Sequence, residues 1–77
     1  MSTAMGMTLA DAASGSQNKV VSLQGDDVLT SRLRELGFIT GEWVRVLGRA
    51  PFGEPILIEI RGSTVALRRL EAECVCL

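Results

Sequence analysis

The sequence predicts a small, mainly β protein: a closed barrel of five short strands, with one helix at about residues 27–36 between the first and second strands. Three observations predict this fold. Apolar and polar residues alternate over several short stretches in the second half of the chain. The connections between these stretches are short, as in small barrels. One earlier stretch shows helical spacing instead. Closure into a barrel also removes exposed strand edges, which promote aggregation.

The chain before the predicted helix contains two short predicted elements separated by turn-forming residues. Residues 1–6, MSTAMG, show no periodic pattern, so we expect a disordered tail or a remnant of cloning, with Met7 a candidate native start. A Thr8-x-x-Asp11 pattern then predicts one or two turns of helix. After SGSQN, the apolar run KVVSL predicts the first strand at residues 19–23.

The helix is predicted from the spacing of three leucines. Leu29, Leu33 and Leu36 are four and three residues apart, which places them on one helical face. Asp26 and Asp27 are suitable residues for capping the N-terminal end, and we prefer this role to that of a carboxylate pair for acid–base chemistry.

A glycine motif marks the end of the helix. Gly37 can adopt the left-handed conformation that terminates many helices, which would let Phe38 fold back onto Leu33. On the solvent side of the same helix, we expect Glu35 to pair with Arg32.

Four strands follow, within WVRVLG, ILIEI, STVALR and ECVCL. Symmetric pairing of the second and third strands about their loop would place Val46 opposite Ile58 and Val44 opposite Ile60, all facing inward. The same register predicts these outward pairs: Leu47 with Leu57, Arg45 with Glu59, and Trp43 with Arg61.

The loop between these two strands, RAPFGEP at residues 49–55, is unusually restrained. Pro51 fixes its own φ, Gly53 permits a positive φ, and Pro55 marks the start of the next strand. Phe52 then either caps an open end of the barrel or presents its ring to a partner. A loop that is rigid before binding loses little entropy on docking, which favours recognition.

Composition excludes several classes of function. The chain has 77 residues, a net charge of −1, and no histidine or tyrosine. It therefore lacks the commonest general base and metal ligand, and its charge does not favour nucleic acid. No nucleophile has a partner base, and no phosphate-binding glycine loop is present. No apolar run is long enough to span a bilayer, and no signal peptide is visible. We expect a cytoplasmic protein that is not an enzyme, has no membrane-inserted segment and requires no cofactor.

Two cysteines and three arginines are the remaining candidates for chemistry. Cys74 and Cys76 are too far apart in a strand to form a disulfide. We expect two small apolar side chains, with a metal bridge between two chains as the alternative. Glu71 and Glu73 are expected on a solvated edge. Arg49, Arg68 and Arg69 are interpreted either as a solvated face or as contacts to acidic groups on a partner.

The motifs together resemble a known family. Leu36-Gly37, Gly41, Arg49-Ala50-Pro51 with Gly53 and Pro55, Arg61-Gly62, and the segment ALRR match the FeoA family of ferrous iron transport accessory proteins over about residues 7–77. The resemblance implies one SH3-like barrel domain that docks on the cytosolic face of the FeoB permease. It also implies a relationship to the carboxy-terminal barrel of DtxR-type metal-dependent repressors.

Departures from the family pattern indicate where this chain differs. Thr40 stands where the family usually has proline, and Trp43 and Leu57 occupy outward positions that are commonly polar. With Leu47 and Phe52 they predict an apolar patch for docking or self-association.

The prediction is thus an adaptor that docks on the permease and modulates its assembly or GTPase-coupled transport. The predicted partner-binding residues are Trp43, Arg49, Pro51, Phe52, Leu57, Arg68 and Arg69. Two alternatives remain open: a metal-bridged or metal-sensing oligomer using Cys74 and Cys76, and a nucleic-acid-binding barrel.

Overall fold

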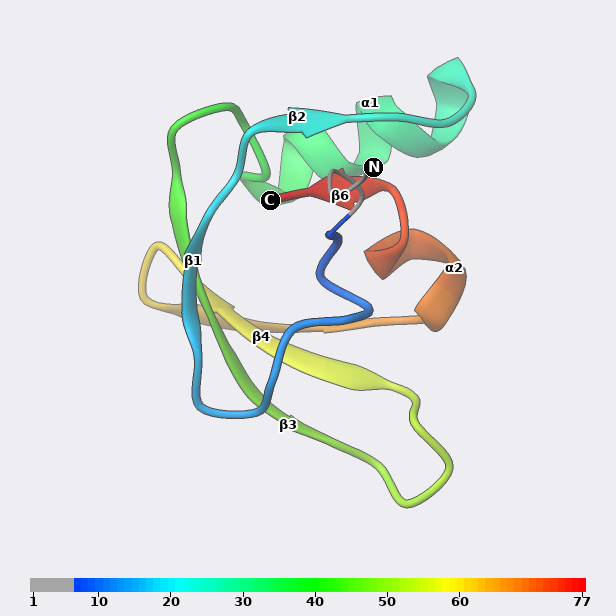
Figure 1. Cartoon of the computed structure of the whole chain (residues 1–77). Coiled ribbons are helices and arrows are strands. Elements are labelled where there is room, and N and C mark those ends of the chain that lie inside the picture. The colour runs from blue at the N-terminus through cyan, green and yellow to red at the C-terminus, as the bar shows by residue number, and fades with distance from the viewer. Residues whose placement is uncertain (1–6) are drawn as a thin grey trace.

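The computed structural model describes residues 7–77 and has a mainly β fold (Figure 1). The tail expected at residues 1–6 lies outside the described residues. The elements in chain order are β1 (Gln17–Lys19), β2 (Ser22–Leu23), α1 (Asp27–Leu36), β3 (Trp43–Arg49), β4 (Ile56–Ile60), β5 (Ser63–Leu67), α2 (Arg69–Ala72) and β6 (Val75–Cys76).

The strands form two antiparallel sheets. One has the order β1-β3-β4-β5, and the other pairs β2 with β6. Thr8 forms an isolated antiparallel β-bridge with Cys76. Figure 1 shows α1 beside β2 and β6, with the four-stranded sheet curving around the other side of the core.

The strand predicted at residues 19–23 is divided between the two sheets. The Val20 N–H donates to the Glu42 carbonyl at 2.9 Å, and the Val20 carbonyl accepts from Gly41 at 2.7 Å. One residue later, the Val21 N–H donates to the Cys76 carbonyl at 2.8 Å. The chain therefore changes partners between Val20 and Val21. This change explains why one continuous apolar run produces two short strands.

The predicted inward register of β3 and β4 is confirmed. Val44 pairs with Ile60 and Val46 with Ile58, and all four side chains are buried. These residues belong to a larger apolar core. Its other large, fully buried members are Leu9, Val20, Leu33, Phe38, Ile56, Leu67 and Val75. The core thus draws on both sheets, α1 and the segment before β1.

Of the three predicted outward pairs, only that of Arg45 with Glu59 is confirmed. Arg45 pairs with Glu59 at 3.1 Å. The pairing of Leu47 with Leu57 is wrong, because a bulge between Val46 and Gly48 places Gly48 opposite Leu57. A β-bulge of this kind bends the strand that carries the extra residue and increases its twist.

Trp43 and Arg61 do not form the predicted pair. Trp43 lies opposite Lys19 of β1, whose Nζ is 5.8 Å from the centre of the indole ring. Arg61 lies in the turn after β4 with a φ of 53°, and its Nε is 3.8 Å from Glu42. The turn begins one residue earlier than the symmetric pairing requires, so Arg61 leaves the ladder.

Both predicted ends of α1 are confirmed. The Asp26 side chain accepts from the Leu29 N–H at 2.8 Å. Gly37 is left-handed, with a φ of 112°, and the Phe38 N–H returns to the Leu33 carbonyl at 3.0 Å. A Cβ at Gly37 would also approach the Arg61 side chain to 3.1 Å. The backbone conformation therefore favours glycine, and a larger residue would also displace the Arg61 side chain slightly.

The segment at Thr8–Asp11 and the connection RLEA differ from the predictions. Thr8 and Asp11 make the expected mutual contact, because the Thr8 N–H donates to the Asp11 carboxylate at 3.2 Å. The backbone nevertheless forms only a turn, with no helical element. RLEA, the connection between the last two predicted strands, forms the short helix α2.

Glu71 is the residue that fixes α2, and its expected position on a solvated edge is wrong. Its side chain is buried and accepts from the Arg68 N–H at 2.8 Å. Its other oxygen lies 3.2 Å from the Arg32 guanidinium on α1. Arg32 therefore pairs with Glu71 rather than with Glu35. This long-range pair connects the two helices.

Truncation of the inward row should destabilise the domain strongly. Ile58→Ala is expected to lower the free energy of unfolding by about 2–4 kcal/mol, since it leaves a cavity between the sheet and the core. Leu57→Ala, at the neighbouring outward position, should cost less than about 1 kcal/mol. Urea unfolding followed by circular dichroism measures both values. Equal losses from the two variants would contradict the register.

The loss of stability on removing each carboxylate should show whether Glu71 or Glu35 pairs with Arg32. Glu71→Ala is expected to cost about 1–3 kcal/mol, because the Arg68 N–H loses its acceptor. Glu35→Ala should change stability by less than about 0.5 kcal/mol. The same urea titration provides the comparison, and a larger loss at Glu35 would reject the helix–helix pair.

Candidate partner-binding site

The loop between β3 and β4 is a hydrogen-bonded tip with an exposed aromatic ring. The Ala50 N–H donates to the Pro55 carbonyl at 3.1 Å, and the Gly53 N–H donates to the Ala50 carbonyl at 2.8 Å. Gly53 has a φ of 89°, a conformation that favours glycine. Phe52 is 97% exposed, so it does not cap the barrel. The tip, defined here as residues 50–55, presents this ring to solvent.

A hydrogen bond from α2 braces the tip. The Arg69 N–H donates to the Glu54 carboxylate at 2.9 Å, and the Arg69 side chain reaches Glu73 at 3.4 Å. The tip and α2 thereby border one shallow hollow. Its lining residues are Glu54, Arg68, Arg69, Leu70 and Glu73.

Leu70 is a candidate contact residue that the sequence pattern did not reveal. Its side chain is 71% exposed and lines the hollow beside the tip. The segment RLEA was interpreted as a connection, and a single leucine in so short a segment has no periodicity that predicts exposure. The structure thus adds an apolar residue to the predicted pair Arg68 and Arg69, which are both exposed there.

Arg49 has an intramolecular role. Its guanidinium donates to the carbonyl of Leu9 at 3.4 Å and also to the carbonyl of Ala12. Arg49 is half-buried at the end of β3. It therefore ties the base of the hairpin to the segment before β1, while Pro51 and Phe52 project beyond it.

The predicted apolar patch on the outer sheet face is divided into two parts. Trp43 and Leu57 are both partly exposed, but the Arg45–Glu59 ion pair occupies the row between them. Trp43 begins β3, so it lies roughly 20 Å along the strand from the tip, at about 3.3 Å per residue. Leu57 lies near the tip, opposite Gly48. Leu57 therefore lies at the end of the sheet from which the tip extends, and Trp43 lies at the opposite end.

The two cysteines have different environments. Cys74 is buried, and its thiol lies 3.3 Å from the Leu70 carbonyl, whereas Cys76 is half-buried. Burial raises the pKa of the Cys74 thiol, and the nearby carboxylates of Asp26 and Glu73 raise it further. Within residues 7–77, no three side chains of the metal-binding types come together. The raised pKa of the Cys74 thiol disfavours its thiolate form.

Two further features concern the surroundings of the chain. No helix in the described part of the chain is long and apolar enough to cross a membrane. A second hollow lies at the C-terminal end of α1 and is lined by residues of α1, β2 and the segment after α1.

Comparison with known proteins gives a consistent result. The family model described as "FeoA domain" matches residues 7–77. A fusion of Fe(2+) transport protein A with the Fe(2+) transporter FeoB from Porphyromonas gingivalis is 33% identical over 66 residues, covering 86% of this chain. The chain spans only 8% of the length of that relative.

Solved structures show the same fold. FeoA of Stenotrophomonas maltophilia, a procaryotic SH3 domain protein complexed with zinc, is 40% identical, with a TM-score of 0.80 over 90% of this chain and 86% of that one. FeoA of Chlorobium tepidum is 33% identical, with a TM-score of 0.82 over 90% of this chain and 66% of that one. The predicted SH3-like fold is thus confirmed.

The two thiols should react at different rates in the folded protein. We expect Cys76 to be alkylated by a maleimide at least about ten times faster than Cys74, since burial and a raised pKa both suppress the Cys74 thiolate. Cys74→Ser and Cys76→Ser isolate each thiol, and mass spectrometry follows the labelling. In urea the rates should converge. Rapid labelling of Cys74 in the folded state would contradict its described environment.

Proposed function

Because the chain belongs to the FeoA family, a family of ferrous iron transport proteins, we propose that it is an accessory protein that docks on the cytosolic domain of a FeoB-type permease. In this role it modulates the assembly or the GTPase-coupled transport of the permease. The Porphyromonas gingivalis relative supports the choice of partner, because it joins the two proteins in one chain. A covalent connection keeps two modules at high effective concentration, as suits partners that act in contact.

The single observation that carries the proposal is the exposed Phe52 on a braced tip. An aromatic side chain that is 97% exposed gains contact area only when a partner covers it. The internal hydrogen bonds of the tip and the contact from α2 reduce the entropy lost on docking. Buried aromatic and arginine side chains dominate the energetics of many interfaces.

The proposed contact surface comprises the tip and the neighbouring part of α2. Phe52 and Pro51 supply its centre, and Leu70 extends the apolar area across the hollow. Arg68 and Arg69 border this area and suit acidic groups on the partner. Leu57 lies at its margin, Arg49 supports it from below, and Trp43 lies outside it.

A role in binding fits the chemistry of the chain better than a role in catalysis. The sequence has no histidine, and the Cys74 thiol is buried with a raised pKa. We therefore assign the exposed residues to recognition. Any GTP hydrolysis coupled to transport is then performed by the permease.

Removal of the Phe52 ring should weaken the complex. Phe52→Ala is expected to reduce retention of the permease's cytosolic domain in a pull-down by about tenfold or more, as for a central aromatic contact. The assay is run with and without guanine nucleotide, which shows whether the nucleotide state of the permease controls docking.

Val28→Ala is the matched control for this experiment. Val28 is also highly exposed, at 83%, but lies on α1 away from the tip. Circular dichroism confirms that both variants are folded. Equal retention of wild type and Phe52→Ala would reject the tip as the docking site, whereas no retention of wild type in any nucleotide state would reject the partner.

A further inference from the structure

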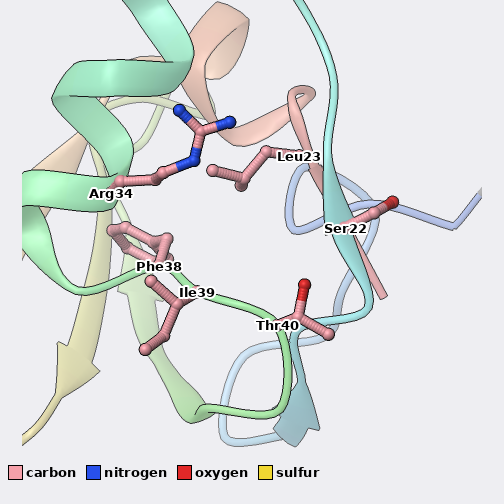
Figure 2. A pocket seen from close by; sticks show the side chains of 6 residues that line it. All are labelled: Ser22, Leu23, Arg34, Phe38, Ile39 and Thr40. Carbon is pink, nitrogen blue, oxygen red and sulfur yellow. The ribbon is translucent and has the colours of Figure 1, made fainter.

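A second surface feature lies at the opposite end of the molecule from the tip. It is a hollow of about 260 Å³ between the last turn of α1, β2 and residues 38–40 (Figure 2). Figure 1 shows α1 and β2 on one side of the molecule and the β3–β4 tip on the other. The hollow is smaller than the ~300–1,000 Å³ typical of small-molecule pockets, so it suits one or two side chains.

The hollow has a mixed lining, with Leu23, Phe38 and Ile39 as its apolar residues and Ser22, Arg34 and Thr40 as its polar ones. Phe38 is fully buried and forms the floor, while Leu23 of β2 and Ile39 form the sides. Ile39 is 44% exposed, which leaves apolar surface available for contact. Thr40 lies at one edge of the hollow (Figure 2). Its hydroxyl donates to the Val21 carbonyl at 3.2 Å.

Arg34 lies at the edge of this hollow, and its guanidinium has no ion-pair partner within residues 7–77. Within residues 7–77, Arg32, Arg45, Arg61 and Arg69 each have a carboxylate within 4 Å, and Arg49 has backbone acceptors. Of the seven arginines, only Arg34 and Arg68 lack either kind of partner in that part of the chain. Each of the two lines one of the two hollows.

The end of α1 does not require the Arg34 side chain. Arginine near a helix C-terminus often binds the last carbonyl groups. Here the Gly37 N–H donates to the Arg34 carbonyl, and the Phe38 N–H donates to the Leu33 carbonyl, both at 3.0 Å. These carbonyl groups are already satisfied by the glycine motif. Within residues 7–77, the Arg34 guanidinium thus has no carboxylate or carbonyl partner and can bind an external group.

We propose that this hollow binds a short segment of a partner protein in which an aliphatic residue lies next to an aspartate or glutamate. The aliphatic side chain contacts Leu23 and Ile39 above the buried Phe38 ring, and the carboxylate pairs with the Arg34 guanidinium. Charge complementarity selects the acid, because a guanidinium beside apolar surface binds a carboxylate through two strong hydrogen bonds. This second docking site does not depend on the tip or on the identity of its partner.

NMR titration of the isotope-labelled protein tests the site. The probe is the blocked peptide Ac-Ser-Leu-Asp-Leu-Ser-amide. We expect saturable shifts at the amides of Leu23 and residues 38–40 and at the Arg34 Nε–H, with a Kd on the order of 0.1–1 mM for so small a ligand. Saturable shifts confined to the tip and α2 would overturn the proposal.

Matched peptides and variants isolate the two contributions. Peptides with Asn for Asp, or Ala for Leu, should bind at least about fivefold more weakly. Arg34→Gln should weaken binding by about tenfold, and Ile39→Ser by about fivefold. Arg68→Gln, which removes the same charge at the other hollow, should have no effect. Equal binding by wild type and Arg34→Gln, or by the Asp and Asn peptides, would overturn the proposal.

The alternative occupants give different results. If the same amides shift with protein concentration in the absence of peptide, the hollow is an interface between copies of this chain, and the proposal is wrong. If a peptide with a free carboxyl-terminal Leu and no Asp binds more tightly than the probe, the site recognises chain ends, which also rejects the internal acid. Neither outcome bears on Phe52→Ala and the permease, so failure here is distinguishable from failure of the proposed function.

Discussion

Burial of the inward valine and isoleucine side chains of β3 and β4 is the constraint on which the rest of the structure depends. Because side chains alternate along a strand, fixing Val46 opposite Ile58 also fixes which residues face solvent. The bulge near Gly48 then changes the phase by one residue just before the tip. Beyond the bulge, the tip is held to α2 by the hydrogen bond from the Arg69 N–H to the Glu54 carboxylate. A domain of this size has a total stability of roughly 3–5 kcal/mol, so the loss of one side chain from this row can remove much of it.

Local patterns allowed accurate prediction where the determining contacts are close in sequence. The caps of α1 depend on Asp26 and Gly37, each within a few residues of the groups that they satisfy. The inward pairs of β3 and β4 follow from alternation about one short loop. The SH3-like fold was recognisable because its motif residues sit at turns with defined backbone requirements.

The remaining features depend on contacts between distant segments. Arg32 meets Glu71 rather than Glu35 because α2, a helix of four residues, holds the Glu71 carboxylate 3.2 Å from the Arg32 guanidinium. Nothing in the local sequence distinguishes that glutamate from a solvated one. Similarly, the division of residues 19–23 between two sheets depends on where β6 returns. For the candidate site, the sequence indicated the rigid tip, but it could not show that Arg49 is engaged internally or that Leu70 is exposed.

The contacts of Arg49 have a practical consequence for handling the protein. The segment that they secure contains Leu9 and Ala12, which are both fully buried. A truncated protein that lacked this segment would lose these core side chains, and the Arg49 guanidinium would lose both of its acceptors. Affinity tags and fluorophores should therefore leave residues 7–12 and the tip unchanged, so that the Arg49 contacts and the exposed Phe52 are retained.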